Sequence, residues 1–223
     1  MLADRHAAAS TASLAVRSVR PVLKWASTHG RRYLAAEVGH ISPPAAVRRR
    51  KRVLDRGELA RLLPVLRASE RPYGTAMRFM LLTLTRRQET ALARWSDVDL
   101  ERGTWKLRET KNDQPHTVPL PHQAVALLRA RFPKGDDGNP GQPNPDGLIF
   151  CTSTGAELGN WDRETKLIQA ASGTDDWHRH DLRRTAATLL GEMGELPDII
   201  EAALNHAAIH SPIAATYNLS LIH

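Results

Sequence analysis

Hydrophobic positions recur at helical spacing near the N-terminus. Across residues 11–28 apolar side chains return about every third or fourth position, which predicts an amphipathic helix that packs through one face. Pro21 lies inside this stretch. Because proline lacks a backbone donor, we expect a kink or the start of a new helix there. The apolar positions are Leu14, Val16, Val19, Val22, Leu23 and Trp25.

A second pattern begins at Val53. Asp55 precedes an apolar-periodic run and is followed three residues later by Glu58, the spacing of a helix capping box. Strongly apolar residues then fill Thr75–Thr85, which predicts a buried helix, and Arg87–Trp95 continues as another. The buried stripe of the first helix is predicted to be Leu59, Leu62, Leu63 and Leu66.

Period-two alternation appears only in short pieces. Thr104–Arg108 and His116–Leu120 flank the polar segment Lys111–Pro115, which predicts a β-hairpin, and Leu148–Cys151 predicts another short strand. Further helices are expected near 123–132, 160–171, 181–192, 196–204 and 211–218, with a turn at Asp97 and Asp99 and a loop over 133–145. The pattern therefore predicts a mainly α protein with a small antiparallel β-sheet, an α+β fold.

Charge divides the chain unevenly. The 223 residues carry a net charge of +7, yet residues 1–52 hold eleven Lys/Arg against two Asp/Glu, and residues 53–223 hold twenty against twenty-two. This basic surplus favours a polyanionic partner for the N-terminal part. A basic run closes it, and we predict that it contacts DNA, although a solvated linker has the same composition. The run consists of Arg48, Arg49, Arg50, Lys51 and Arg52.

Two absences narrow the class of protein. Cys151 is the single cysteine, which excludes an intramolecular disulfide and suits a reducing, cytoplasmic compartment. No run approaches about 18 consecutive apolar residues, so we expect no membrane span.

One constellation of polar residues carries chemistry. Tyr217 follows His206 by eleven residues, His180 and Arg183 lie one helical turn apart, and Arg86 follows an apolar helix. A tyrosine hydroxyl can attack a phosphodiester when cations stabilise its anion and hold the phosphate, without a metal ion. His178 and His180, with Asp175 and Asp176 close by in sequence, offer a possible metal pair, but no cysteine joins them and their spacing fits no standard site, so we predict no metal ion.

These residues resemble the tyrosine recombinases, the phage-integrase-like family. Leu81–Glu89 followed by Leu92–Asp99 resembles the first active-site box, and His180–Thr188 resembles the second, with its His-x-x-Arg. Leu204–His206 with Tyr217 resembles the third box. The lysine hairpin of the family is matched by Thr110-Lys111 and Thr117-Val118-Pro119-Leu120. The resemblance covers residues 53–217 in order.

The resemblance implies the catalytic-domain fold of that family and site-specific cleavage and rejoining of DNA. It implies that Tyr217 attacks to give a 3′-phosphotyrosyl linkage and that Lys111 protonates the departing 5′ oxygen. His180 would act as acid, base or phosphate ligand, and His206 would donate to a phosphate oxygen. The remaining implied roles are phosphate binding by Arg86 and Arg183 and support of the site by Glu89. Double-stranded DNA and a homo-oligomer, a tetramer on DNA, would be the partners, with no cofactor or ATP.

Other interpretations of the same residues stay open at this stage. Arg86 suits a structural salt bridge with Glu89, Arg183 a solvated surface, His180 a core position, and Tyr217 core packing. The whole chain also suits a type IB topoisomerase-like enzyme, a non-catalytic DNA-binding remnant, or a basic structural or RNA-binding protein.

Departures from the family pattern concern both ends and two backbone positions. Leu84 stands where the family usually has glycine, so we expect an altered approach to Arg86, whereas Asn205, also at a frequent glycine, tolerates left-handed backbone angles. Only six residues follow Tyr217. We expect residues 1–46 to be the remnant of a helical DNA-clamp domain with its linker, residues 47–223 to be the catalytic domain, and the chain to be a fragment or truncated member.

Overall fold

The computed structural model describes residues 2–28, 51–108, 116–133 and 141–205. The chain divides into two compact units, Met1–Lys51 and Arg52–His223, which are taken separately below. The expected helix near 211–218, the tip of the hairpin and part of the loop over 133–145 lie outside the described residues.

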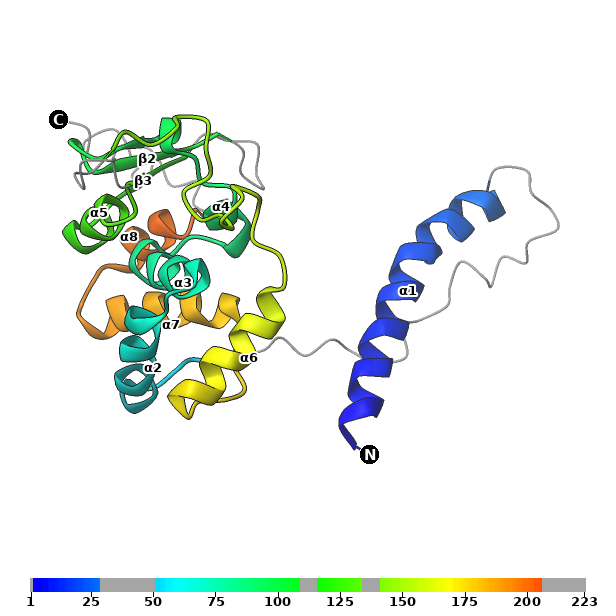
Figure 1. The fold of residues 1–223 in the computed structure, drawn as a ribbon. Helices are drawn as coiled ribbons and strands as arrows, with labels where there is room; N and C mark the ends of the chain where they lie inside the picture. Colours follow the sequence, from blue (N-terminus) through cyan, green and yellow to red (C-terminus); the bar gives the residue numbers. More distant parts are fainter. Residues whose placement is uncertain (1, 29–50, 109–115, 134–140, 206–223) are drawn as a thin grey trace. The chain divides into compact units, whose positions relative to one another are not determined.

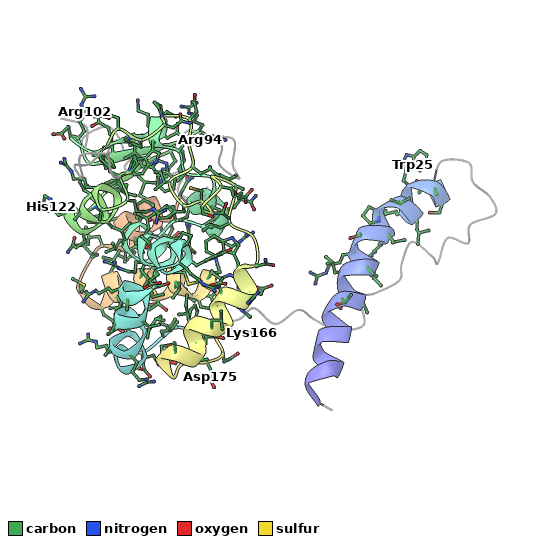
Figure 2. The ribbon with its side chains drawn as sticks, in the orientation of Figure 1. Trp25, Arg94, Arg102, His122, Lys166 and Asp175 are labelled. Carbon is green, nitrogen blue, oxygen red and sulfur yellow. The ribbon has the colours of Figure 1, made fainter. Side chains whose placement is uncertain are left out.

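The first unit contains α1, Leu2–Thr28 (Figure 1). The predicted helix is confirmed and is longer than expected. Of the two alternatives expected at Pro21, the start of a new helix is excluded, because α1 continues through that residue as one element. Within this unit the side chain of Leu14 is 65% exposed and that of Trp25, labelled in Figure 2, is 56% exposed. None of the described helices is both long and apolar enough to cross a bilayer.

The second unit begins with a capped helix, α2, Arg56–Ala68. Asp55 Oδ1 accepts a hydrogen bond from the Glu58 N–H at 2.8 Å, and Glu58 Oε2 accepts one from the Asp55 N–H at 3.0 Å, which confirms the predicted capping box. This arrangement satisfies two amide donors that a helix N-terminus leaves unpaired. Leu62 and Leu66 are fully buried on the face that turns toward the core.

α3, Pro72–Thr83, lies at the centre of the second unit and packs against α2, α4, α5, α6 and α7 (Figure 1). Phe79 on this helix contacts the rings of Trp105 and Phe150 at centroid distances of 5.4 and 5.3 Å. Burial of this much aromatic surface holds the sheet and the helices around one core. Because α3 is held on several sides, the position of its C-terminal end at Thr83 is fixed, and so is the start of the turn that follows.

α4 is shorter than the pattern predicted. Helix was expected over Arg87–Trp95, but α4 covers Arg87–Ala91 and a 3-10 turn follows at Trp95–Asp97. The backbone between these elements pairs elsewhere: Ala93 O accepts from the Ile149 N–H at 2.8 Å, and Arg94 forms a bridge with Leu148. The predicted strand at Leu148–Cys151 is for the same reason reduced to isolated bridges.

The described strands are β1 (Val98–Asp99), β2 (Thr104–Leu107) and β3 (His116–Pro119). They form one antiparallel sheet in the order β1-β2-β3. The predicted hairpin is confirmed, with Trp105 opposite Val118 and Leu107 opposite His116. Of the turn expected at Asp97 and Asp99, Asp97 lies in the 3-10 turn, whereas Asp99 lies in β1, and its Oδ1 accepts from the amides of Glu101 and Arg102 in the turn that follows.

Four further helices complete the described part of this unit. They are α5 (His122–Arg129), α6 (Trp161–Ser172), α7 (Arg179–Glu192) and α8 (Pro197–Ala203), close to the predicted ranges. A small second core of Leu84, Ala186 and Leu204 joins the end of α3 to α7 and α8. The predicted class, mainly helical with a small antiparallel sheet, is confirmed.

Candidate active site

The first site element is the turn between α3 and α4. Leu84 is the C-cap of α3 and precedes Thr85 and Arg86. Its backbone adopts the left-handed conformation, with φ 56° and ψ 21°. Leucine thus takes the backbone angles that glycine would favour. Such angles cost about 1–2 kcal/mol for a side chain with Cβ. Burial of the Leu84 side chain, worth about 1.5–3 kcal/mol, offsets that cost.

Hydroxyl groups fix the same turn from inside. Thr83, Thr85 and Thr90 form a buried chain, with oxygen–oxygen distances of 2.8 Å between Thr83 and Thr85 and 3.0 Å between Thr85 and Thr90. Thr83 also donates to Phe79 O at 2.7 Å. Buried polar groups satisfied in this way hold one conformation, so the residue after Thr85 is placed firmly.

That residue is Arg86, the N-cap of α4. The Glu89 carboxylate accepts two hydrogen bonds from Arg86. Oε2 accepts from the backbone N–H at 2.6 Å, and Oε1 accepts from Nη1 at 2.6 Å. The salt bridge considered from the sequence is therefore present. The Arg86 side chain remains 25% exposed, whereas Glu89 is 9% exposed. The carboxylate orients the guanidinium while a part of it still faces solvent.

Arg183 reaches the same carboxylate from α7. Its side chain is 3% exposed, so the interpretation as a solvated surface arginine is wrong. Nη1 donates to Leu84 O at 2.5 Å and lies 3.9 Å from Glu89 Oε2, and Nη2 donates to Leu204 O. The planar guanidinium fork allows these donations at once. Leu84 and Leu204 are the C-caps of α3 and α8, and a cation is favourable at such carbonyl ends.

Burial has an electrostatic cost for Arg183. Desolvation and, after it, the nearby positive charge of Arg86 lower the pKa of its guanidinium, while Glu89 and Glu201 act in the opposite direction; the net pKa is about 10. A pKa of about 10 still leaves the group charged at neutral pH. Two guanidinium groups, those of Arg86 and Arg183, lie against the carboxylate of Glu89.

His180 adds an imidazole at the start of α7, one turn before Arg183. Asp181 stabilises this helix start by accepting from the His178 N–H at 2.9 Å. Desolvation lowers the pKa of His180; Arg183, Arg184 and Arg86 lower it further, and Asp181 opposes them. The residue is exposed, unlike the core position considered from the sequence. Arg86, Glu89, His180 and Arg183 are thus brought together as predicted.

His116 also faces this cluster and was missed as a site residue. Desolvation lowers the pKa of its imidazole; Glu89 opposes this shift, and Arg183 and Arg86 contribute to it. The sequence held a usable signal. His116 and Val118 share one face of β3, and Val118 is buried, so strand alternation alone directs His116 inward.

Comparison with known proteins agrees with this geometry. The model of the phage integrase family matches residues 52–219, about three quarters of the chain. The chain belongs to the phage integrase family. It is 31% identical over 170 residues to prophage integrase IntA of Escherichia coli strain K12, covering 73% of this chain and 38% of IntA. It is 34% identical over 155 residues to prophage integrase IntZ of the same strain, covering 68% of this chain and 36% of IntZ.

The chain thus spans little more than a third of the length of these curated relatives. Among solved structures, a lambda integrase (75–356) dimer bound to a COC′ core site superposes with a TM-score of 0.69. The match covers 92% of this chain and 74% of that chain at 18% sequence identity. At this identity the likeness supports the fold, and it confirms the predicted catalytic-domain architecture of the family.

Three predicted members of the integrase site, Lys111, His206 and Tyr217, lie outside the described residues. The structure reaches the neighbours of two of them. His116 begins the strand after the Lys111 segment, and Arg183 holds the carbonyl of Leu204, two residues before His206. Asn205 between them has φ 45°, the left-handed conformation that asparagine was expected to tolerate.

The predicted DNA-binding run is also only partly described, since Arg48, Arg49 and Arg50 lie outside the described residues. Lys51 is exposed. Arg52 has a structural use: Nη1 donates to Glu58 Oε2 at 2.9 Å, Nη2 pairs with Oε1, and Nε donates to Asp176 O at 3.1 Å. The pair lowers the pKa of Glu58 and raises that of Arg52.

Proposed function

We propose that this integrase-family chain cleaves and rejoins DNA strands at specific sites through a covalent tyrosine intermediate. The single observation that carries the proposal is the meeting of Arg86 and Arg183 on Glu89, with His180 in electrostatic contact. Arg86 and Arg183 come from helices nearly one hundred residues apart, and they make a small cationic site suited to one phosphate.

In the proposed reaction, the Tyr217 hydroxyl oxygen attacks the phosphorus of a DNA phosphodiester. A phosphorus–oxygen bond to tyrosine forms as the bond to the 5′ oxygen breaks. The tyrosine proton passes to a base, for which His180 is the candidate, and Lys111 protonates the departing oxygen. Arg86, Arg183 and His206 stabilise the charge on the non-bridging oxygens.

Rejoining reverses these steps. The phosphotyrosyl bond conserves the energy of the phosphodiester, so the 5′-hydroxyl of a second strand displaces the tyrosine. We propose on this basis that neither ATP nor a metal ion is required. The guanidinium groups supply the charge stabilisation that a metal would supply in other phosphoryl-transfer sites.

For the arrangement on DNA, we propose that residues 1–46 are the remnant of a helical clamp with its linker and that residues 47–223 are the catalytic domain. Arg48, Arg49, Arg50 and Lys51 are the proposed phosphate contacts of the basic run. Assembly is proposed to be homo-oligomeric, with a tetramer as the strand-exchanging form. The dimeric, DNA-bound state named for the lambda integrase structure supports an assembly of more than one copy.

The proposal is tested with a pool of nicked suicide duplexes of randomised sequence. The nick lets the released 5′-hydroxyl fragment diffuse away, so a covalent protein–DNA adduct accumulates. Sequencing of the trapped DNA identifies the target, and peptide mapping identifies the linked residue. We expect the link at Tyr217, and Tyr217→Phe should form no adduct while retaining DNA affinity. Adducts that persist in Tyr217→Phe would reject the nucleophile.

Absence of any adduct with the unaltered chain would leave a DNA-binding remnant as the function. Relaxation of a supercoiled plasmid without a paired site would instead identify a topoisomerase-like activity. When the affinity of the chain for DNA is measured directly, it should fall steeply as the salt concentration rises, because lysine and arginine contacts to phosphates release counterions. An affinity that is constant from low to high salt would contradict the proposed phosphate contacts.

A further inference from the structure

His116 presents a buried polar atom that the interactions of the described residues leave unsatisfied. Its Nε2 atom is inaccessible to solvent and has no hydrogen-bond partner among the described residues. Buried polar atoms in native proteins nearly always have a partner, so an unsatisfied one indicates a group that binds in another state of the molecule. The question is which group fits.

The charges around His116 favour an anion. Glu89 from α4, Arg86 from the start of α4 and Arg183 from α7 all act on the imidazole. Glu89 is already engaged by both guanidinium groups, at 2.6 Å by Arg86 and at 3.9 Å by Arg183. Two positive charges against one negative charge leave an excess that a phosphate would neutralise.

The strand geometry holds the ring toward this site. His116 pairs with Leu107 across the hairpin and lies on the same face of β3 as Val118. Leu107 and Val118 are both buried, so the inner face of the hairpin is anchored in the core. His116 is therefore carried by a regular strand rather than by a loop, which is the more rigid support for a binding group.

We propose that His116 is a further phosphate-binding residue, whose Nε2–H donates a hydrogen bond to a non-bridging oxygen of the DNA phosphate held by Arg86 and Arg183. This rests on the function proposed above. Two cations and desolvation disfavour a second proton on the ring, as the lowered pKa of His116 indicates. A neutral imidazole keeps one N–H donor, so it adds a contact without adding repulsion between cations.

A kinetic comparison tests the contact. On the trapped target duplex, His116→Leu should slow adduct formation about 10- to 100-fold, the value of one hydrogen bond to a charged group. His116→Gln carries an amide N–H near the place of Nε2 and should retain most of the rate. The matched control is His122, which is exposed on α5 (Figure 2). His122→Leu and His122→Gln should react like the unaltered chain.

DNA affinity should change little in all four variants, because one contact among many phosphates is removed. A His116→Leu variant that forms adducts at the unaltered rate would overturn the proposal. So would a His116→Gln variant as slow as His116→Leu while both remain folded and bind DNA, because the amide donor then fails to replace the imidazole.

A second measurement needs neither cleavage nor a variant that must fold on its own. The 15N resonance of His116 Nε2 is followed in the unaltered full chain during titration with inorganic phosphate, with chloride matched for ionic strength. We expect a saturable shift at His116 Nε2 and no shift at His122. A resonance that stays in place would overturn the proposal. If the unaltered chain forms no adduct but the shift occurs, the proposed cleavage fails while phosphate binding by His116 stands.

Discussion

Arg183 and Arg86 lie against the same carboxylate but are held in opposite ways. Arg183 is almost fully buried and donates to Leu84 O and Leu204 O, so it closes the ends of two helices. Arg86 is a quarter exposed and is held mainly by its neighbour Glu89. Arg183 therefore stabilises the fold and also belongs to the site. Arg86 contributes less to the stability of the fold, so its guanidinium is available mainly for binding phosphate.

This difference matters for interpreting mutants. Loss of activity after removal of Arg183 would combine a folding defect with a chemical one, whereas loss after removal of Arg86 would report on the phosphate site. Variants at each arginine separate the two contributions.

Arg183→Ala should lower the free energy of unfolding by about 3–5 kcal/mol, because it leaves the carbonyls of Leu84 and Leu204 without their donor and removes one of the two cations beside Glu89. Arg183→Lys should recover little, since an ammonium group lacks the planar fork that reaches both carbonyls. Urea unfolding measures both. Arg163→Ala on the exposed surface of α6 is the control and should change stability by less than about 0.5 kcal/mol. A stable Arg183→Ala protein would remove the structural half of the comparison.

Arg86→Ala should reduce the rate of adduct formation by about 10²–10³-fold, the usual effect of removing one donor to a developing oxyanion. Its free energy of unfolding should fall by only about 1 kcal/mol, because the partly exposed side chain forms a single short-range pair. Single-turnover trapping and urea unfolding on the same sample give both numbers. The control is Arg102→Ala, whose exposed side chain lies 3.8 Å from Asp99. Equal destabilisation by Arg86→Ala and Arg183→Ala would show that the two arginines are held alike.

Leu84 allows the backbone strain beside Arg86 to be measured. Leu84→Ala removes buried side-chain volume but keeps the left-handed angle, and should cost about 2–4 kcal/mol. Leu84→Gly removes the same volume and also relieves the angle, so it should be more stable than Leu84→Ala by about 1 kcal/mol. Because burial outweighs strain, both variants should be less stable than the unaltered chain. A Leu84→Gly protein that exceeds the unaltered chain in urea unfolding would reverse that ranking.

Local features of this fold were predictable from the sequence. The capping box of Asp55 and Glu58 and the hairpin before His116 depend on residues close together in the chain, and the structure contains both. The pairing of Arg86 with Glu89, three residues on, belongs to the same class. Short-range spacing determines which groups can meet in these cases, so pattern alone was sufficient.

Features that depend on distant contacts were not predictable. Arg183 reaches Leu84 across 99 positions in the chain, and no spacing rule could distinguish its burial from solvation. α4 ends early because Ala93 and Arg94 pair with residues near 148 instead of extending the helix. Strand alternation directs His116 inward, but that it comes under the charges of Arg86, Glu89 and Arg183 depends on residues distant in the chain.

The smallest expected effect concerns pH. The pKa values of His116 and His180 lie below their ordinary value of 6.5 in the folded chain. As pH falls below about 6.5 the unfolded state binds these protons first, so the free energy of unfolding should decrease through that window. His116→Gln should flatten part of the slope, and His122→Gln should not.

Measurements from pH 7.5 to 5.5 avoid the carboxylates, because the lowered pKa of Glu58 makes its stabilising charge disappear only below its ordinary value of 4.5. A slope that His116→Gln leaves unchanged would mean that the imidazole titrates as freely in the folded chain as in the unfolded one. The ring would then face water rather than the two arginines.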